Sequence, residues 1–515
     1  MGDQMEITAV LMDVSAIQQY VFGSNKLKEN LGASYLVGNI YEQYLNIALK
    51  NLGIACDLQQ WETAGIRICD QDIDVEIGYI GGGNALLFFK DNDKAVDLAK
   101  EWTKILLVET PGLVPSITVK KIECSALSDE NRFSSLMDDL FGSLQKNKNE
   151  HQPQTTIPRH GITAECSHTG LSAECYDEIN NEYISSVAMA KIRKTDEANK
   201  VLLTKFHNVL GNMTFPMKLE ELGQREGDSH ISIVHIDGNN MGLRFQACKT
   251  LEDIRALSKS VRKATERSFE ALLKYIINHY GDLSKIVNLE KNTLPIRPII
   301  LGGDDITFIS HGKLGIHFAR IFLEALTKQN LNRGKPLSAC AGVAITKTKY
   351  PFYRGYQLSD DLCKQAKIRA HNESDHNTSW LDFHIAYGGF SGSIEDIRKN
   401  HYTAPGGSLC LRPYRVTKEQ ADHLNLSECL KGIRYLSNNS WPRSKLKEFR
   451  DVLTLGPSAV IMFITEMEYR GKSLPDISGT DARKTGWLED ITPYFDMLEL
   501  MEFYPIDLIT MGGDT

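Results

Sequence analysis

The sequence lacks the features of a membrane protein, a secreted protein or a protein that coats nucleic acid. No apolar run approaches the length of a transmembrane helix, and the opening residues hold no basic stretch followed by an apolar one, as a signal peptide would. Positive charge is not in excess either, because 58 Lys and Arg stand against 66 Asp and Glu and give a net charge of −8. This balance argues against an extended basic surface that binds the phosphates of nucleic acid. We expect a cytoplasmic protein that acts on a small substrate, or on RNA with the help of partners.

Closely spaced cysteine pairs are also missing, although the chain has ten cysteines. The cysteines are scattered, unlike the dense framework of a disulfide-stabilised domain. Several lie in predicted strands, which favours reduced and buried thiols. No C-x-x-C occurs in the connecting region that holds His160 and His168, and Cys166 and Cys175 are too far apart for a standard zinc knuckle.

What the sequence does contain is the composition of an ordinary globular protein. Of its 515 residues, 42% are hydrophobic and 24% are charged. This length is enough for roughly three domains. The apolar patterns predict two halves with the same order, β-α-β-β-α-β, which is the ferredoxin-like arrangement. In the first half these elements are predicted at residues 7–13, 14–49, 75–79, 85–89, 94–108 and 114–120. In the second half they are predicted at residues 231–237, 251–279, 297–301, 305–310, 314–326 and 337–345.

The two halves share more than the order of their elements. In each, the first apolar strand ends in an aspartate, Asp13 or Asp237, and a glycine-rich hairpin follows, at 81–84 or 302–305. This correspondence indicates an internal repeat of a whole domain.

The remaining segments divide the chain further. The polar, proline-containing stretch 145–158 is typical of a linker, a helix is predicted at 185–210, and the residues after 372 are mostly helical in pattern. The fold class is therefore α+β, with two ferredoxin-like domains, a connecting module and a helical C-terminal domain. We place these parts at residues 1–145 (first repeat), 146–227 (linker and connecting module), 228–372 (second repeat) and 373–515 (C-terminal domain).

The chemistry is concentrated in the second repeat, at Gly302-Gly303-Asp304-Asp305. Apolar runs on both sides predict strand, tight turn, strand, and the glycines allow the backbone to turn sharply and to approach a phosphate. Asp237 ends a neighbouring strand, so its carboxylate can join the other two. Three carboxylates around hard divalent cations suit in-line displacement at phosphorus. The alternative is that Asp237 caps a helix and that Asp304 and Asp305 only form a turn.

Lysines follow the last strand of the second repeat. Lys349 and Lys367 lie where a sheet edge could present them to a triphosphate as point charges, although a single lysine is more often a solvated surface residue.

These motifs, in this order, resemble the catalytic palm of the CRISPR polymerase family, the large subunit of type III CRISPR effector complexes. The resemblance is carried by Asp237-Gly238-Asn239-Asn240-Met241-Gly242, by Gly302 to Asp305, and by Ser338 to Ile345 leading to Lys349-Tyr350-Pro351. Residues 15–22 and 32–36 resemble the first palm of that family. The resemblance spans roughly residues 5 to 370. More distantly, the palm is similar to GGDEF diguanylate cyclases and class III nucleotide cyclases.

The resemblance implies synthesis of cyclic oligoadenylates from ATP for antiviral defence, with release of pyrophosphate. It implies that Asp237, Asp304 and Asp305 carry two Mg²⁺ or Mn²⁺ ions and that Asp304 and Asp305 are catalytic. The nucleotide-binding residues it implies are Gly302, Gly303, Gly238, Asn239, Asn240, Lys349, Lys367, Ser34, Gly82, Gly83 and Asn84. The partners it implies are ATP, CRISPR effector subunits and guide or target RNA, and a homodimer is compatible with it.

The sequence departs from the family pattern at three places. Asn239 stands where the family commonly has Asp, and Gly83-Asn84 stands where the first palm could have had an acidic pair. The first palm begins almost at Met1, so we expect no N-terminal nuclease domain. The family often carries a zinc module between its palms; here we expect a metal-free remnant, with zinc at Cys166 and Cys175 as the weaker alternative.

Two other functions stay open at this point. One is a stand-alone cyclic nucleotide or dinucleotide synthase that needs no CRISPR partners. The other is a catalytically silent scaffold subunit that binds RNA. For the enzyme, the repeat predicts an active site at the interface of the two palms, with metals in the second palm and a second nucleotide presented by the first.

Overall fold

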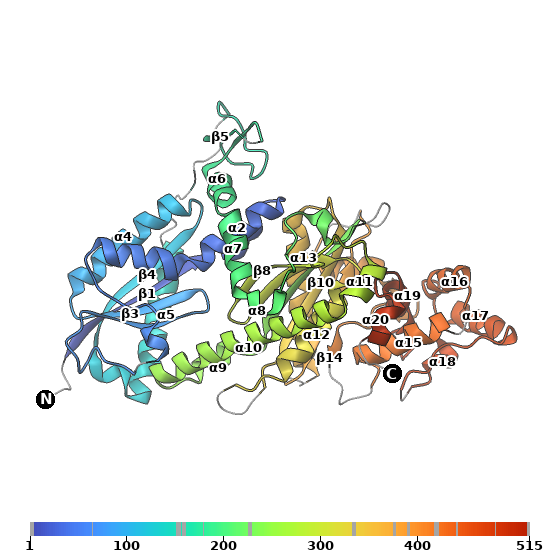
Figure 1. Cartoon of the computed structure of the whole chain (residues 1–515). Helices are drawn as coiled ribbons and strands as arrows, with labels where there is room; N and C mark the ends of the chain where they lie inside the picture. The colour runs from blue at the N-terminus through green and yellow to red at the C-terminus, as the bar shows by residue number, and fades with distance from the viewer. Residues whose placement is uncertain are drawn as a thin grey trace.

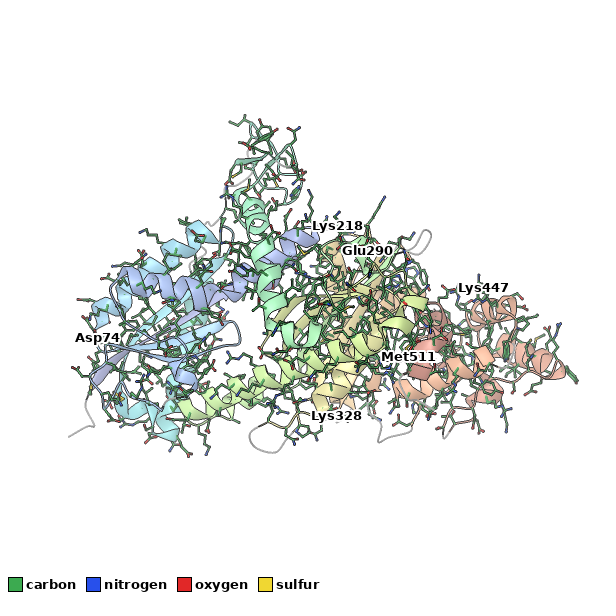
Figure 2. All side chains as sticks on the ribbon, in the orientation of Figure 1. Asp74, Lys218, Glu290, Lys328, Lys447 and Met511 are labelled. Carbon is green, nitrogen blue, oxygen red and sulfur yellow. A yellow bond between two sulfur atoms is a disulfide. The ribbon has the colours of Figure 1, made fainter. Side chains whose placement is uncertain are left out.

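The computed structural model describes residues 5–511, apart from 64, 151–155, 157–160, 179, 225–228, 332–335, 374–376, 389–391, 417–421, 439–440 and 479. The molecule is elongated, with the first palm, the second palm and the C-terminal helices following one another (Figure 1). Asp74 lies near the outer end of the first palm, and Lys447 lies among the C-terminal helices on the other side of the second palm (Figure 2). No helix among the described residues has the length and apolar character to cross a membrane.

The first palm is built on a four-stranded antiparallel sheet in the order β2-β3-β1-β4. Its strands are β1 (Glu6–Ser15), β2 (Val75–Gly81), β3 (Asn84–Phe89) and β4 (Val114–Glu123). This is the ferredoxin-like order that the sequence predicts, with the central β1 paired to both β3 and β4. Its helices and helical turns are α1 (Ile17–Phe22), α2 (Leu27–Gly38), η1 (Ile40–Tyr44), α3 (Leu45–Asn51), η2 (Gln60–Glu62), α4 (Asn92–Glu109), η3 (Cys124–Leu127) and α5 (Glu130–Glu150).

Two details of this region differ from expectation. Helix α5 runs to Glu150, so the first residues of the predicted linker 145–158 are helical, because Phe133, Leu136, Leu140 and Leu144 bury one face of the helix against the sheet. Cys69 and Cys124 pair as a disulfide with their Cα atoms 5.8 Å apart, so not every cysteine is the reduced thiol that their scatter favoured.

The connecting region contains β5 (Cys175–Asp177), β6 (Glu182–Ile184), α6 (Ser186–Arg193), α7 (Thr195–Lys205), α8 (His207–Leu210) and η4 (Leu219–Leu222). The part of it around β5 projects above the junction of the palms, and α6, α7 and α8 lead from it down between them (Figure 1). Helices α6 and α7 both pack against α2 of the first palm.

The second palm has a six-stranded sheet in the order β14-β11-β10-β7-β9-β8. Its strands are β7 (His230–Gly238), β8 (Ile296–Gly302), β9 (Asp305–His311), β10 (Ala339–Lys347), β11 (Ser379–Ile385) and β14 (Tyr414–Val416). The four strands from β10 to β8 repeat the ferredoxin-like order. Strands β11 and β14 extend the sheet after residue 372, so the expected domain boundary there falls inside the sheet.

Helices cover the second palm and continue into the C-terminal part. Those of the palm are α9 (Met241–Gln246), α10 (Leu251–Asn278), α11 (Tyr280–Ile286), α12 (Gly315–Thr327) and α13 (Phe352–Asn372). The C-terminal part contains α14 (Ile394–His401), β12 (Thr403–Ala404), β13 (Gly407–Ser408), α15 (Leu426–Asn438), α16 (Arg443–Leu453), α17 (Pro457–Tyr469), α18 (Ala482–Thr485), α19 (Tyr494–Phe503) and α20 (Ile506–Met511). One continuous apolar core joins it to the second palm.

The two palms are packed against each other. The ring of Phe22 on α1 stacks on Tyr356 of α13 with centroids 3.8 Å apart, and on Phe352 at 5.8 Å. The long helix α10 reaches β2 of the first palm, where the buried Arg255 forms a 3.0 Å ion pair with the buried Glu76. These contacts fix the first palm over one edge of the second.

Candidate active site

The three aspartates meet at one edge of the second palm sheet. Gly302 and Asp305 are the last paired residues of β8 and β9, so Gly303 and Asp304 form a two-residue turn, with Gly303 at φ 59°. Strand β7 lies beside β9, with Ile236 opposite Ile306, and this pairing brings Asp237 next to the turn. The strand order therefore brings the three aspartates together, as the sequence predicts.

Gly238, at the end of β7, lies so close to the turn that there is little room for a side chain. A Cβ there would lie 2.9 Å from the Asp304 Cβ, so a larger residue would push the carboxylate away.

Burial and mutual repulsion act on these carboxylates. The pKa of Asp304 is raised to about 6, first by burial and then by the charge of Asp237. The pKa of Asp305 is raised to about 8 by burial and by the charges of Asp237 and Asp304. Although 33% of the Asp305 side chain is exposed, its Oδ1 is buried without a hydrogen-bond partner. Such a group of carboxylates is stabilised by positive charge.

Part of that positive charge is supplied by Lys367 on α13. Its Nζ lies 2.5 Å from Asp237 Oδ2 and 3.3 Å from the carbonyl oxygen of Gly238. Within the described ranges, no group of three or more His, Cys, Asp or Glu side chains is arranged so that it could hold a metal ion. The buried, unpartnered Asp305 oxygen and the neighbouring acids are nevertheless the hard oxygen donors that Mg²⁺ and Mn²⁺ prefer, so the residues fit divalent cations.

The buried side chain of His235 lies between two acids of the site, Asp305 and Asp360. His235 Nδ1 lies 3.4 Å from Asp305 Oδ1 and 3.2 Å from Thr307 Oγ1, while its Nε2 is 3.6 Å from Asp360 Oδ1 of α13. Burial lowers the pKa of His235. The sequence reasoning missed His235 and Asp360, although His235 stands two residues before Asp237 and therefore faces the same side of the strand.

A cavity of about 850 Å³ lies over the carboxylates and is lined by both palms. The second palm contributes Asp237, Asp304 and Asp305, and the first contributes Gly82 and Gly83 of its own hairpin. Gln18 of α1 also lines it and offsets part of the rise in the Asp305 pKa. The cavity therefore lies where the repeat predicted an interfacial site.

The remaining predicted nucleotide-binding residues do not line this cavity. Asn239 is buried and its amide donates to Ser338 Oγ at 3.1 Å, and Asn240 precedes α9 with φ 57°. Asn84 donates to the Gly82 carbonyl at 3.4 Å, and Lys349 is exposed beyond β10. The Ser34 hydroxyl donates to the carbonyl oxygen of Ile299 and lines a neighbouring cavity.

The first palm repeats the site in a modified form. Asp13 pairs in register with Asn84 on β3, which stands in the first palm where Asp305 stands in the second. Lys148 of α5 contacts the Asp13 carboxylate. A single acid neutralised by a lysine leaves this palm without the cluster found in the second.

The zinc alternative concerns the connecting region. Cys166 is buried and Cys175 half-buried, and His168 lies 2.6 Å from Glu29 and 2.9 Å from Glu182 in an ion-pair network. His160 lies outside the described residues. Among the described residues of this region, no group of three or more His, Cys, Asp or Glu side chains is arranged so that it could hold a metal ion.

The fold and site together define a protein with tandem palm domains, of which the second carries the carboxylate cluster. Residues 230–375 match the family described as the second palm domain of Cas10/Cmr2. Residues 230–375 are therefore a domain of this family, and the resemblance of the second palm seen in the sequence is confirmed. A comparison with curated protein sequences finds no match.

Solved structures share this architecture at low sequence identity. A Csm1-Csm4 cassette in complex with pppApApA aligns with a TM-score of 0.56 and 12% identity, over 97% of this chain and 70% of that one. The cassette in complex with cA4 gives 0.52 and 12%, again over 97% and 70%. Csm1 of T. onnurineus gives 0.51 and 13%, over 99% and 70%. At these identities the likeness shows the fold.

Proposed function

We propose that the chain is a metal-dependent nucleotidyltransferase that makes cyclic oligoadenylates from ATP. The observation that carries this proposal is the convergence of Asp237, Asp304 and Asp305 on a cavity that the first palm closes. The adenine base is supported by the fold relatives, which were solved with cA3, cA4 and an ATP analogue.

Each elongation step is a substitution at phosphorus. The 3′-oxygen of one nucleotide forms a bond to the α-phosphorus of another, the bond from that phosphorus to the bridging oxygen breaks, and pyrophosphate leaves. The hydroxyl proton passes to solvent. When the 3′-hydroxyl and the 5′-triphosphate belong to the same chain, this substitution closes a ring.

Different residues of the chain would bind the metal ions and the phosphates. Asp237, Asp304 and Asp305 would hold Mg²⁺ or Mn²⁺, which when bound lowers the pKa of the attacking hydroxyl and neutralises the leaving pyrophosphate. Lys367, whose Nζ contacts Asp237, would hold a triphosphate oxygen. Gly303 lets the backbone approach phosphate without a Cβ, and Gly82 and Gly83 do the same from the first palm.

The test is incubation of the purified chain with ATP and Mg²⁺ or Mn²⁺, with pyrophosphate release and mass spectrometry of the product as readouts. The wild type should form a phosphodiester product, and the double variant Asp304→Asn/Asp305→Asn should reduce its formation by at least about 10³-fold. Asp13→Asn, at the corresponding strand end of the first palm, is the matched control and should retain synthesis. Product formation that survives the double variant would overturn the assignment.

Dependence on partners is tested with the same assay. We propose that CRISPR effector subunits, guide RNA and target RNA stimulate the chain, in keeping with the cassette form of its fold relatives. If the isolated chain is inert and an assembled complex with target RNA is active, the protein works as an effector subunit. Equal activity with and without the complex favours a stand-alone synthase.

A further inference from the structure

A separate cavity lies against α10, on the face of this helix opposite the cavity over the carboxylates. It measures about 320 Å³ and is formed by α10 and by the residues that follow α12, and we call it the α10 pocket. Helices α10 and α12 pack against each other (Figure 1). The α10 pocket shares no lining residue with the cavity over the carboxylates, so a ligand bound here is not a reacting nucleotide.

Three cations of α10 line this pocket, namely Lys259, Lys263 and Arg267. They are spaced four residues apart and therefore lie on one face of the helix, where like charges repel one another. Lys259 donates to the carbonyl oxygen of Glu62, and the exposed Lys263 and Arg267 make no side-chain hydrogen bond or ion pair with a described residue. Among the described residues that line the pocket there is no acid. An anion would therefore stabilise these charges.

Helix α10 holds the three cations in place before a ligand arrives. Arg255 ties the helix to Glu76 of the first palm, and Thr265 Oγ1 donates to the carbonyl oxygen of Gly303 at 2.6 Å in the second. Because the helix is fixed by both palms, a ligand that binds to it orders little additional backbone, which favours affinity.

The other wall of the α10 pocket is polar and uncharged. Gln329 and Asn330 line it directly after α12, and their side-chain amides form no hydrogen bond with a described residue. An amide both donates and accepts hydrogen bonds, as the edge of a nucleobase does. The carbonyl end of α12 carries partial negative charge, so phosphates are favoured at α10 and not at this wall.

We infer that the α10 pocket binds a nucleoside triphosphate. The polyphosphate contacts Lys259, Lys263 and Arg267, and the nucleoside contacts Gln329 and Asn330. The volume lies at the lower end of the range of about 300–1,000 Å³ for small-molecule sites, which suits one nucleotide better than a chain of them. This site is additional to the proposed synthesis and does not depend on it.

The test is a calorimetric titration of the purified chain with ATP in EDTA. Without divalent cation, the carboxylates of Asp237, Asp304 and Asp305 repel a triphosphate, so binding at the α10 pocket dominates the signal. The variant Lys263→Gln/Arg267→Gln removes two of the three cations and should weaken ATP binding at least about tenfold.

The control Lys200→Gln/Lys274→Gln removes the same charge from exposed positions outside the pocket. Its affinity for ATP should stay within about twofold of the wild type, because exposed charges at a distance are screened by salt. Unchanged ATP binding in Lys263→Gln/Arg267→Gln overturns the inference, and so does an equal loss in the control.

Inorganic tripolyphosphate tests the contacts to the nucleoside. ATP should bind the wild type about tenfold more tightly than tripolyphosphate does. Gln329→Ala/Asn330→Ala should remove this advantage and leave the affinity for tripolyphosphate within about twofold of the wild type. If tripolyphosphate binds the wild type as tightly as ATP, a nucleotide is the wrong ligand.

An oligoadenylate RNA of about ten nucleotides without a 5′-phosphate tests a different class of ligand. It should bind the wild type and Lys263→Gln/Arg267→Gln equally. If the substitutions weaken RNA binding and leave ATP binding unchanged, the pocket is an RNA contact and the inference is wrong. None of these titrations requires turnover, so absence of product from ATP contradicts only the proposed function.

Discussion

At the scale of single residues, the two palms differ in what surrounds one aspartate. Asp13 and Asp237 lie near the ends of equivalent strands, and each contacts a lysine, Lys148 or Lys367, from a following helix. In the second palm, the carboxylates of Asp304 and Asp305 stand beside this aspartate–lysine pair. In the first palm, Gly83 and Asn84 stand at the positions of these two acids. Lys367 therefore lies beside three carboxylates and balances only part of their negative charge, whereas Lys148 balances the single charge of Asp13.

This difference predicts unequal effects of removing the two lysines. Lys367→Met should slow pyrophosphate release from ATP about 10²-fold, because a positioned cation next to the reacting phosphates is lost. Lys148→Met should stay within about twofold of the wild type. Steady-state assays on both variants provide the comparison, and similar losses in the two would argue against a triphosphate role for Lys367.

Arg255 is the residue that most directly ties the palms together. Its guanidinium pairs with Glu76 and donates to the carbonyl oxygens of Ile77 and Gly78 at 2.8 and 2.6 Å. Arg255→Ala should destabilise this contact by about 3–5 kcal/mol, since it leaves a buried carboxylate without its partner. Thermal unfolding measures the effect.

Lys274→Ala, exposed on the same helix, provides the control for this change and should leave the midpoint unchanged. The double variant Arg255→Met/Glu76→Gln should lose less than the sum of its single changes, because the two side chains are coupled. Additive losses would show that the pair does not act as a unit.

At the scale of elements, the sequence predicts the strands that carry the site. Strands β7, β8 and β9 lie where the apolar run ending in Asp237 and the Gly302–Asp305 hairpin predict them. Strand β11 escaped prediction because no hairpin motif precedes it, and it pairs in parallel with β10 across the intervening α13. His235 and Asp360 escaped prediction for a different reason, since their contact with the site depends on how β7, β9 and α13 pack together.

Helix α13 is held against the sheet by a close backbone contact. A Cβ at Gly342 of β10 would lie 1.9 Å from the carbonyl oxygen of Ser359, so any side chain there must displace the helix. Because α13 carries Asp360 and Lys367, Gly342→Ala should lower both the thermal midpoint and the rate of synthesis. Gly242→Ala, where nothing lies within 4 Å, should change neither.

At the scale of the whole molecule, the arrangement of the palms keeps several partly buried acids close together. The raised pKa values of Asp304 (about 6) and Asp305 (about 8) mean that the folded protein binds protons more tightly than the unfolded chain, whose aspartates titrate near 3.9. Their contribution to stability is complete below about pH 4 and is lost as the pH rises through 6 and 8.

The metal-free protein should therefore become less stable between pH 5 and pH 8, and a divalent cation should restore more stability at pH 8 than at pH 6. Thermal unfolding in EDTA, and then with Mn²⁺, measures both effects. In Asp304→Asn/Asp305→Asn the pH dependence should flatten and the cation should lose its effect, because the amides neither titrate nor repel one another. If the double variant kept the wild-type slope, the pH dependence would have to arise from other groups, and these carboxylates would not dominate the electrostatics of the interface.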